Sequence, residues 1–350
     1  MGQLIRHVGD PMRPDAPAGT AGVKAAYRAV AHLAAVGMVV AATGAAISQP
    51  VGPLQSVATL LATTGPLSGS VTALILGGTG QPTPSPEYAR SAEALYLNAL
   101  GFNGGSTDSM VCHMDGTDPC SAPLQVLTTP ELFQQSNAAD ALKIVLAVQN
   151  EFAANPGAFD ADHPLTIFGY SQSATAESMA MTQLAAAGIP TDALHFVFIG
   201  NPSAPNGVWQ HLEAAMDATL GTKFTDFVLS FTGMDTSIGS STPNDLYPTT
   251  IYSLPDDPVA NFVDSYAANG LWGALLNIFG PHVEYLGLTP EQIADATITV
   301  DGMLTYVDIN DADINGFDAW LSALLEHGVA NSDPLQSVWD SLVLLFTNSY

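Results

Sequence analysis

Positive charge is scarce in this sequence. Only 7 of its 350 residues are lysine or arginine, against 33 aspartates and glutamates, which gives a formal net charge of −26. Four of the seven basic residues lie within the first 28 positions, so residues 49–350 contain three cations and 31 of the acidic residues. A surface this acidic repels a phosphate backbone, so we expect no nucleic-acid partner. It also offers no electrostatic attraction to anionic lipid headgroups.

Charged residues of either sign are few, at 11% of the chain, whereas 47% of the residues are hydrophobic. Because cations for ion pairs are lacking, the fold must depend mainly on apolar burial and on backbone hydrogen bonds. This apolar content suffices for a large core and argues against disorder outside the N-terminus. The length allows one large α/β domain or two small ones.

Cysteine is also rare, and Cys112 and Cys120 are the only two in the chain. Two cysteines that close a short polar loop predict a disulfide in an oxidising compartment. Closing so short a loop stabilises the fold by about 2–3 kcal/mol. His113 and Asp115 lie inside the loop, but a metal site needs further well-spaced ligands, so we expect no metal.

The long apolar run near the N-terminus, residues 29–47, follows the basic cluster and ends in small residues. This order is typical of an export signal, with cleavage between about Ala45 and Ser48. An uncleaved anchor with its basic end inside is the alternative. We therefore expect residues 1–48 to direct an extracytoplasmic, envelope or membrane-anchored location. Residues 49–70, rich in Gly, Ser, Thr and Pro, form a connector.

The most informative motif is Gly169-Tyr170-Ser171-Gln172-Ser173. An apolar run at 165–168 precedes it and a predicted helix at 174–187 follows it. α/β-Hydrolases present their nucleophilic serine at such a strand-to-helix turn, in a strained backbone conformation between small residues. Ser173 replaces the usual second glycine. The alternative interpretation is an ordinary polar turn that caps a helix.

Alternating apolar strands and helices predict a largely parallel sheet that is covered on both faces. Residues 71–350 are therefore expected to form an α/β-hydrolase domain. Residues 201–247 lack this alternation and carry several aromatic residues; they form either a lid over an acyl-binding groove or a plain excursion that packs on the core. The expected strands are 71–76, 124–127, 165–168, 194–199 and 249–254, and the expected helices are 86–99, 136–153, 174–187 and 259–278.

A hydrolase of this kind needs an acid and then a histidine after the serine. The acid should follow the late strand at 249–254, where Asp256 and Asp257 stand side by side. We favour Asp257, with Asp256 as the alternative, since one of the two could instead cap the next helix. Of the histidines after these residues, His282 follows a predicted helix and His327 lies near the end of another. We favour His282 as the base that Asp257 orients toward Ser171.

The oxyanion hole needs two backbone N–H groups. One comes from the residue after the nucleophile, Gln172, and the other from a loop after an early strand. The glycine-rich stretch 77–80 fits that loop, with Thr79 or Gly80 as the donor. A dinucleotide-binding turn is the alternative, but the spacing of its glycines is missing, so we expect no cofactor.

Together these motifs resemble the mycobacterial PE-PPE domain family, which is distantly cutinase-like. The resemblance covers roughly residues 71–310. It is carried by residues 76–85, the 169–174 turn, Gly200-Asn201-Pro202, residues 257–262 and His282. The family more usually reads Tyr-Asp at the acid and has an aspartate where this chain has Asn261. The PE or PPE module that names the family is not apparent.

The resemblance implies an α/β-hydrolase fold and esterase or acyltransferase activity on acyl esters. Some relatives move fatty acyl chains between trehalose glycolipids of the cell envelope. We therefore expect an exported serine enzyme whose partners are a lipid or glycolipid acyl donor and a hydroxyl acceptor, in association with membrane or envelope. Hydrolysis and transfer share an acyl-enzyme and differ only in what attacks it. The alternative is a non-catalytic envelope-binding protein with a decayed hydrolase fold.

Overall fold

A computed structural model of the protein describes residues 65–104, 109–131, 136–310 and 314–326. The predicted export or anchor segment 1–48, most of the connector 49–70 and His327 lie outside these residues. Within the described part of the chain, no helix is long and apolar enough to cross a membrane.

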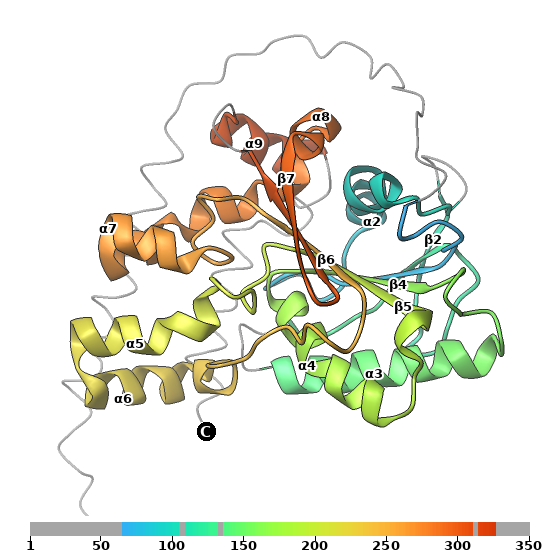
Figure 1. Cartoon of the computed structure of the whole chain (residues 1–350), viewed down its shortest axis with the longest axis horizontal. Coiled ribbons are helices and arrows are strands. Elements are labelled where there is room, and N and C mark those ends of the chain that lie inside the picture. Colours follow the sequence, from blue (N-terminus) through green and yellow to red (C-terminus); the bar gives the residue numbers. More distant parts are fainter. Residues whose placement is uncertain (1–64, 105–108, 132–135, 311–313, 327–350) are drawn as a thin grey trace, which may run out of the picture. The chain divides into compact units, whose positions relative to one another are not determined.

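The centre of the fold is an eight-stranded sheet in the order β2-β3-β1-β4-β5-β6-β8-β7 (Figure 1). All neighbouring strands are parallel except β7 and β8, which form an antiparallel hairpin at one edge. The predicted parallel sheet, and with it the α/β-hydrolase fold, is confirmed. The strands are β1 (Ala73–Ile75), β2 (Val111–His113), β3 (Leu124–Val126), β4 (Leu165–Tyr170), β5 (Leu194–Ile199), β6 (Thr249–Ser253), β7 (Ala296–Asp301) and β8 (Leu304–Ile309).

Both faces of this sheet are apolar because successive side chains of a strand point to opposite faces. In β1, Ala73 and Ile75 join one hydrophobic cluster, whereas Leu74 joins another on the opposite face. Figure 1 shows α3 and α4 on one side of the sheet and α2 on the other. The helices that complete the two clusters are α2 (Pro86–Ala92) and α9 (Gly316–Glu326) on one face, and α3 (Asn137–Ala154) and α4 (Gln172–Ala186) on the other.

Ion pairs contribute little to this architecture, as the composition predicts. In the described part of the chain, Arg90 forms a salt bridge with Glu87 over 3.9 Å at the surface. Exposed pairs of this kind stabilise a fold by about 0–1 kcal/mol. The predicted disulfide is confirmed, because Cys112 in β2 is bonded to Cys120.

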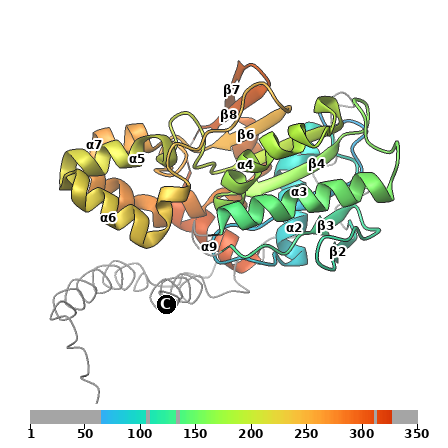
Figure 2. The same ribbon diagram turned by 90° about the horizontal axis from the view of Figure 1, so that it is seen from below.

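A third hydrophobic cluster lies in a helical lobe made of α5 (Val208–Leu220), α6 (Thr222–Thr232) and α7 (Phe262–Leu276). Figure 2 shows these helices together at one end of the sheet. Residues 201–247 contain α5 and α6 and no strand, which agrees with the absence of strand–helix alternation in their sequence. The single residue Gly221 ends α5 and begins α6 with φ 83°, so no Pro-rich or polar linker marks the boundary. That this lobe acts as a lid stays a prediction.

Candidate active site

Ser171 lies at the turn between β4 and α4, at the carboxyl end of the strand. Its φ of 58° and ψ of −113° make it one of the two non-glycine residues with positive φ in the described part of the chain. Such a conformation is strained and persists only where neighbouring contacts impose it. Here the N–H of Ser171 donates to the carbonyl of Ile199 in β5 over 3.1 Å, which ties the turn to the adjacent strand.

The small residues on either side of Ser171 are required by close packing. A Cβ at Gly169 would lie 2.4 Å from Oε1 of Glu177 and 3.0 Å from the N of Ala174, so any side chain would push α4 away. Ser173 is fully buried, and its hydroxyl accepts from the N–H of Tyr170 over 2.9 Å and donates to the carbonyl of Tyr170 over 3.1 Å. The serine that replaces the usual glycine thus braces the turn.

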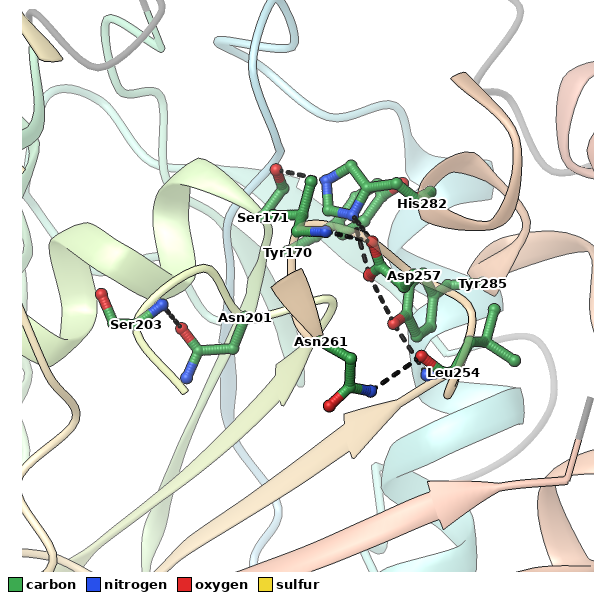
Figure 3. A network of polar contacts seen from close by, with 10 residues as sticks. Tyr170, Ser171, Asn201, Ser203, Leu254, Asp257, Asn261, His282 and Tyr285 are labelled. Atoms are coloured by element: carbon green, nitrogen blue, oxygen red, sulfur yellow. Dashed lines mark hydrogen bonds and ion pairs between the residues drawn. The ribbon is translucent and has the colours of Figure 1, made fainter. Parts of the chain in front are cut away.

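His282 lies in a 3-10 turn, Pro281–Val283, and its Nε2 is 2.8 Å from Oγ of Ser171 (Figure 3). The imidazole is buried, with 6% of the residue exposed. Gly200, with φ 55°, makes room for it, since a Cβ there would lie 3.0 Å from Cε1 of His282 and 3.1 Å from its Nδ1. His282 can therefore occupy this position only because the first residue of the Gly200-Asn201-Pro202 turn is a glycine.

Asp257 is the carboxylate that contacts His282. Its Oδ2 and Oδ1 lie 3.0 and 3.1 Å from Nδ1 of the imidazole, and the residue is fully buried. Oδ1 also accepts from the N–H of Val259 over 2.8 Å. Asp256 is exposed. Of the two adjacent aspartates left open by the sequence, the fold thus brings Asp257 to the histidine.

Asn261 stands where the family pattern has an aspartate. Its side-chain amide donates to the carbonyl of Leu254 over 3.0 Å (Figure 3), and its N–H donates to the carbonyl of Asp257 over 2.8 Å. The asparagine therefore holds the turn that carries Asp257, and the departure from the family pattern leaves the contact between Asp257 and His282 in place.

Two tyrosines that the sequence did not single out complete the network. The hydroxyl of Tyr285 donates to Oδ2 of Asp257 over 2.7 Å and accepts from the N–H of Leu254 over 3.0 Å. Burial and the nearby Asp257 raise the pKa of Tyr285, so the phenol stays a donor. The hydroxyl of Tyr170 donates to the carbonyl of His282. Contacts between residues so far apart in the chain leave no local signal in the sequence.

This arrangement has the geometry of a nucleophile, a base and an orienting acid. The imidazole can accept the proton of the Ser171 hydroxyl as the oxygen attacks, and Asp257 can hold the ring in the tautomer that leaves Nε2 free to do so. The buried carboxylate is tolerated because His282, Tyr285 and Val259 all donate to it; an unpaired charge in such a place is strongly destabilising.

The predicted oxyanion loop lies against the turn of Ser171. A Cβ at Gly78 would lie 3.3 Å from the Tyr170 ring and 3.5 Å from Cβ of Ser171. The amide of Gln172 belongs to the first turn of α4, where N–H groups have no partner inside the helix. The amide of Gly80, however, donates to the carbonyl of Glu131 over 3.0 Å. This contact corrects the prediction for Gly80 and leaves Thr79 as the candidate in the loop.

One buried histidine of the sheet does not belong to the site. His195 in β5 is buried, its Nε2 lies 3.0 Å from Oγ1 of Thr250, and desolvation lowers its pKa to about 4, so it is a neutral core residue. No cluster of three or more His, Cys, Asp or Glu residues in the described ranges is placed to hold a metal ion.

A serine at the turn between a parallel strand and a helix, followed in the chain by its aspartate and histidine, is the arrangement found in α/β-hydrolases, and this protein has that fold. A sequence model of the PE-PPE domain matches residues 121–307, more than half of the chain. The protein therefore belongs to the PE-PPE domain family.

Two Mycobacterium tuberculosis proteins are similar to the chain. The uncharacterized PPE family protein PPE28 is 33% identical over 253 residues, which cover 71% of this chain and 34% of PPE28. Esterase PE16 is 31% identical over 261 residues, which cover 71% of this chain and 43% of PE16. The chain thus spans less than half the length of these relatives.

Solved structures give weaker similarities. A cutinase-like protein from Cryptococcus sp. is 19% identical with a TM-score of 0.34, over 56% of this chain and 82% of its own. The NocB thioesterase domain from the nocardicin cluster is 15% identical with a TM-score of 0.30, over 79% of this chain and 95% of its own.

Proposed function

We propose that the protein is a serine esterase or acyltransferase that acts on acyl esters. The observation that carries this proposal is the continuous contact of three side chains, with 2.8 Å between Ser171 and His282 and 3.0 Å between His282 and Asp257. The similarity to a protein named an esterase supports the same class of reaction.

In the proposed reaction the Oγ of Ser171 attacks the ester carbonyl while His282 takes its proton. The C–O bond of the ester then breaks, His282 gives the proton to the departing alcohol, and an acyl-enzyme remains. Water or a hydroxyl acceptor attacks this acyl group, again with His282 as the base, and Ser171 regains its proton. General-base catalysis of this kind accelerates a reaction typically about 10²–10⁴-fold.

The finer proposal is that the acyl donor is a lipid or glycolipid of the cell envelope, such as an acylated trehalose. The helical lobe supports an apolar substrate, because large hydrophobic side chains on α6 and α7 are exposed. They are Phe224 at 53%, Phe227 at 54%, Trp272 at 60% and Leu276 at 60%. The disulfide supports an oxidising location, which agrees with the proposed export or anchoring by residues 1–48.

The test is the hydrolysis of p-nitrophenyl acyl esters of increasing chain length by the purified full chain. We expect activity that Ser171→Ala abolishes and that Ser121→Ala, at an exposed serine next to the disulfide, leaves intact. A folded wild-type protein without activity in this assay and without reaction at Ser171 would refute the proposal. It would favour the non-catalytic envelope-binding protein instead.

Transfer and hydrolysis are distinguished by adding a sugar acceptor. The acyl donor is incubated with and without trehalose, and the products are analysed by mass spectrometry. An acylated trehalose that forms with wild-type protein and not with Ser171→Ala indicates transfer. Release of free fatty acid alone indicates hydrolysis.

A further inference from the structure

The two halves of the predicted oxyanion hole come from distant parts of the chain, the loop at 77–81 and the start of α4. A single buried carboxylate connects them. We propose that Asp140 is a positioning residue that holds both halves in register, because it fixes one end of the Gln172 side chain, whose other end accepts from Thr79 in the loop. The inference rests on the proposed esterase or acyltransferase function.

The first connection runs through hydrogen-bonded side chains. Asp140 lies in the first turn of α3, and its Oδ2 accepts from Oγ of Ser136 over 2.6 Å and from Nε2 of Gln172 over 3.5 Å. Nε2 of Gln172 also donates to Oγ of Ser136 over 3.0 Å. At its other end, Oε1 of Gln172 accepts from Oγ1 of Thr79 over 2.9 Å. Both ends of the Gln172 amide are therefore fixed, one by α3 and one by the oxyanion loop.

A second connection holds the loop, because the carbonyl of Glu131 accepts from the N–H of Gly80 over 3.0 Å. Glu131 has φ 45° and is, with Ser171, one of the two non-glycine residues at positive φ in the described ranges. Such strain persists where surrounding contacts over-determine a conformation. The contact to Gly80 is of that kind.

We call the hydrogen-bonded side chains of Asp140, Ser136, Gln172 and Thr79 the bracket, and burial makes this bracket rigid. Asp140 and Gln172 are fully buried, and Ser136 is 6% exposed. In such a low-dielectric place hydrogen bonds to a carboxylate are strong, so the bonds to Oδ2 of Asp140 hold Ser136 and Gln172 in one arrangement. Because preorganised donors act only when they point at the developing oxyanion, a small rotation of Gln172 or of the 77–81 loop lowers the rate. It leaves substrate binding largely unchanged.

The test compares Asp140→Ala with Glu151→Ala. Glu151 is an equally buried acid on the same helix, three turns from the bracket, and its carboxylate accepts from Asn155 over 3.1 Å. Removing a whole oxyanion donor costs about 10²–10³-fold in kcat. Displacing one should cost less, so we expect Asp140→Ala to lower kcat about 10- to 100-fold with KM within about twofold. Glu151→Ala should leave both constants near those of wild type.

Further variants separate positioning from folding. Asp140→Asn keeps an acceptor for Ser136, so it should recover most of the kcat. Thr79→Val breaks the other end of the bracket without touching α3 and should lower kcat in the same direction. In a Gln172→Ala background, Asp140→Ala should lower kcat by a smaller factor than it does alone, because the effects of substituting two contacting residues are not additive.

The outcomes distinguish this inference from the proposed function. Ser171-dependent activity with an unchanged kcat in folded Asp140→Ala, or in Thr79→Val if Asp140→Ala does not fold, overturns the role of Asp140 and leaves the function standing. A kcat that falls equally in Glu151→Ala also overturns it. A wild-type protein without Ser171-dependent activity removes the proposed function, and this inference with it.

Discussion

Tyr285→Phe tests how the acid of the site is held. The substitution removes the hydroxyl that donates to Asp257 over 2.7 Å and accepts from the N–H of Leu254 over 3.0 Å, and it leaves the ring in place. A hydrogen bond to a charged group contributes about 1.5–3 kcal/mol, and a buried donor left without a partner costs about 1–3 kcal/mol. We expect the free energy of unfolding to fall by roughly 2–4 kcal/mol, since the two losses are not fully additive.

The same variant should lower kcat without abolishing it. Asp257 keeps its contacts to His282 and to the N–H of Val259, so the carboxylate remains near the imidazole but is free to turn. Complete loss of the orienting acid in a serine hydrolase costs about 10⁴-fold, and a misplacement costs far less, so we expect a fall of about 10-fold in kcat.

The assay is thermal unfolding together with ester hydrolysis at a temperature at which all variants are folded. Tyr247→Phe is the matched control, because Tyr247 is buried and its hydroxyl donates to the carbonyl of Ile189 over 3.1 Å, away from the site. It should lose stability and keep kcat. If Tyr285→Phe also keeps the wild-type kcat, the hydroxyl does not orient Asp257 and the reasoning is refuted.

Three further predictions concern the rest of the fold. Gly200→Ala should lower kcat at least about 10-fold, because its Cβ would lie 3.0 Å from the His282 ring and would displace the base; an unchanged kcat would show that the ring can shift freely. Cys112→Ser with Cys120→Ser should lower the free energy of unfolding by about 2–3 kcal/mol at an unchanged kcat, as measured by denaturant titration; equal stability would contradict it. Burial raises the pKa of Glu177, so the folded state holds this proton more tightly than the unfolded chain. The stability that the protonated Glu177 contributes is complete below the ordinary pKa of a glutamate and is lost as the pH rises above it. Glu177→Gln should therefore flatten the fall in melting temperature between about pH 5 and 8. An unaltered slope would count against a protonated Glu177 in the folded state.

The local parts of the site could be predicted from the sequence because their signals are local. The turn around Ser171 is marked by an apolar strand, small residues and a helix within a few positions, and all are present as β4 and α4. The order of serine, acid and histidine then leaves few choices for the base. The sequence favours Asp257 but leaves Asp256 as an alternative, because only the path of the turn decides which of two neighbours is buried.

The remaining parts depend on contacts between distant residues. The roles of three residues depend on hydrogen bonds to partners that lie 28 or more positions away in the sequence. They are Tyr285, Asp140 and Gly80. The hairpin of β7 and β8 was missed although its residues alternate on both sides of the two-residue loop Gly302-Met303, and a glycine in the first position of such a loop is favoured. The helix predicted at 86–99 ends as α2 at Ala92 and continues as a π turn, Glu93–Leu97, and a 3-10 turn, Asn98–Leu100.

The central claim is that Ser171 is a nucleophile activated by His282. The most direct test is intact-protein and peptide mass spectrometry after reaction with a fluorophosphonate. We predict one adduct per chain, on the peptide that contains Ser171, with none in Ser171→Ala and a much slower reaction in His282→Ala. An adduct that survives Ser171→Ala, or a folded wild-type protein that does not react, would contradict the account.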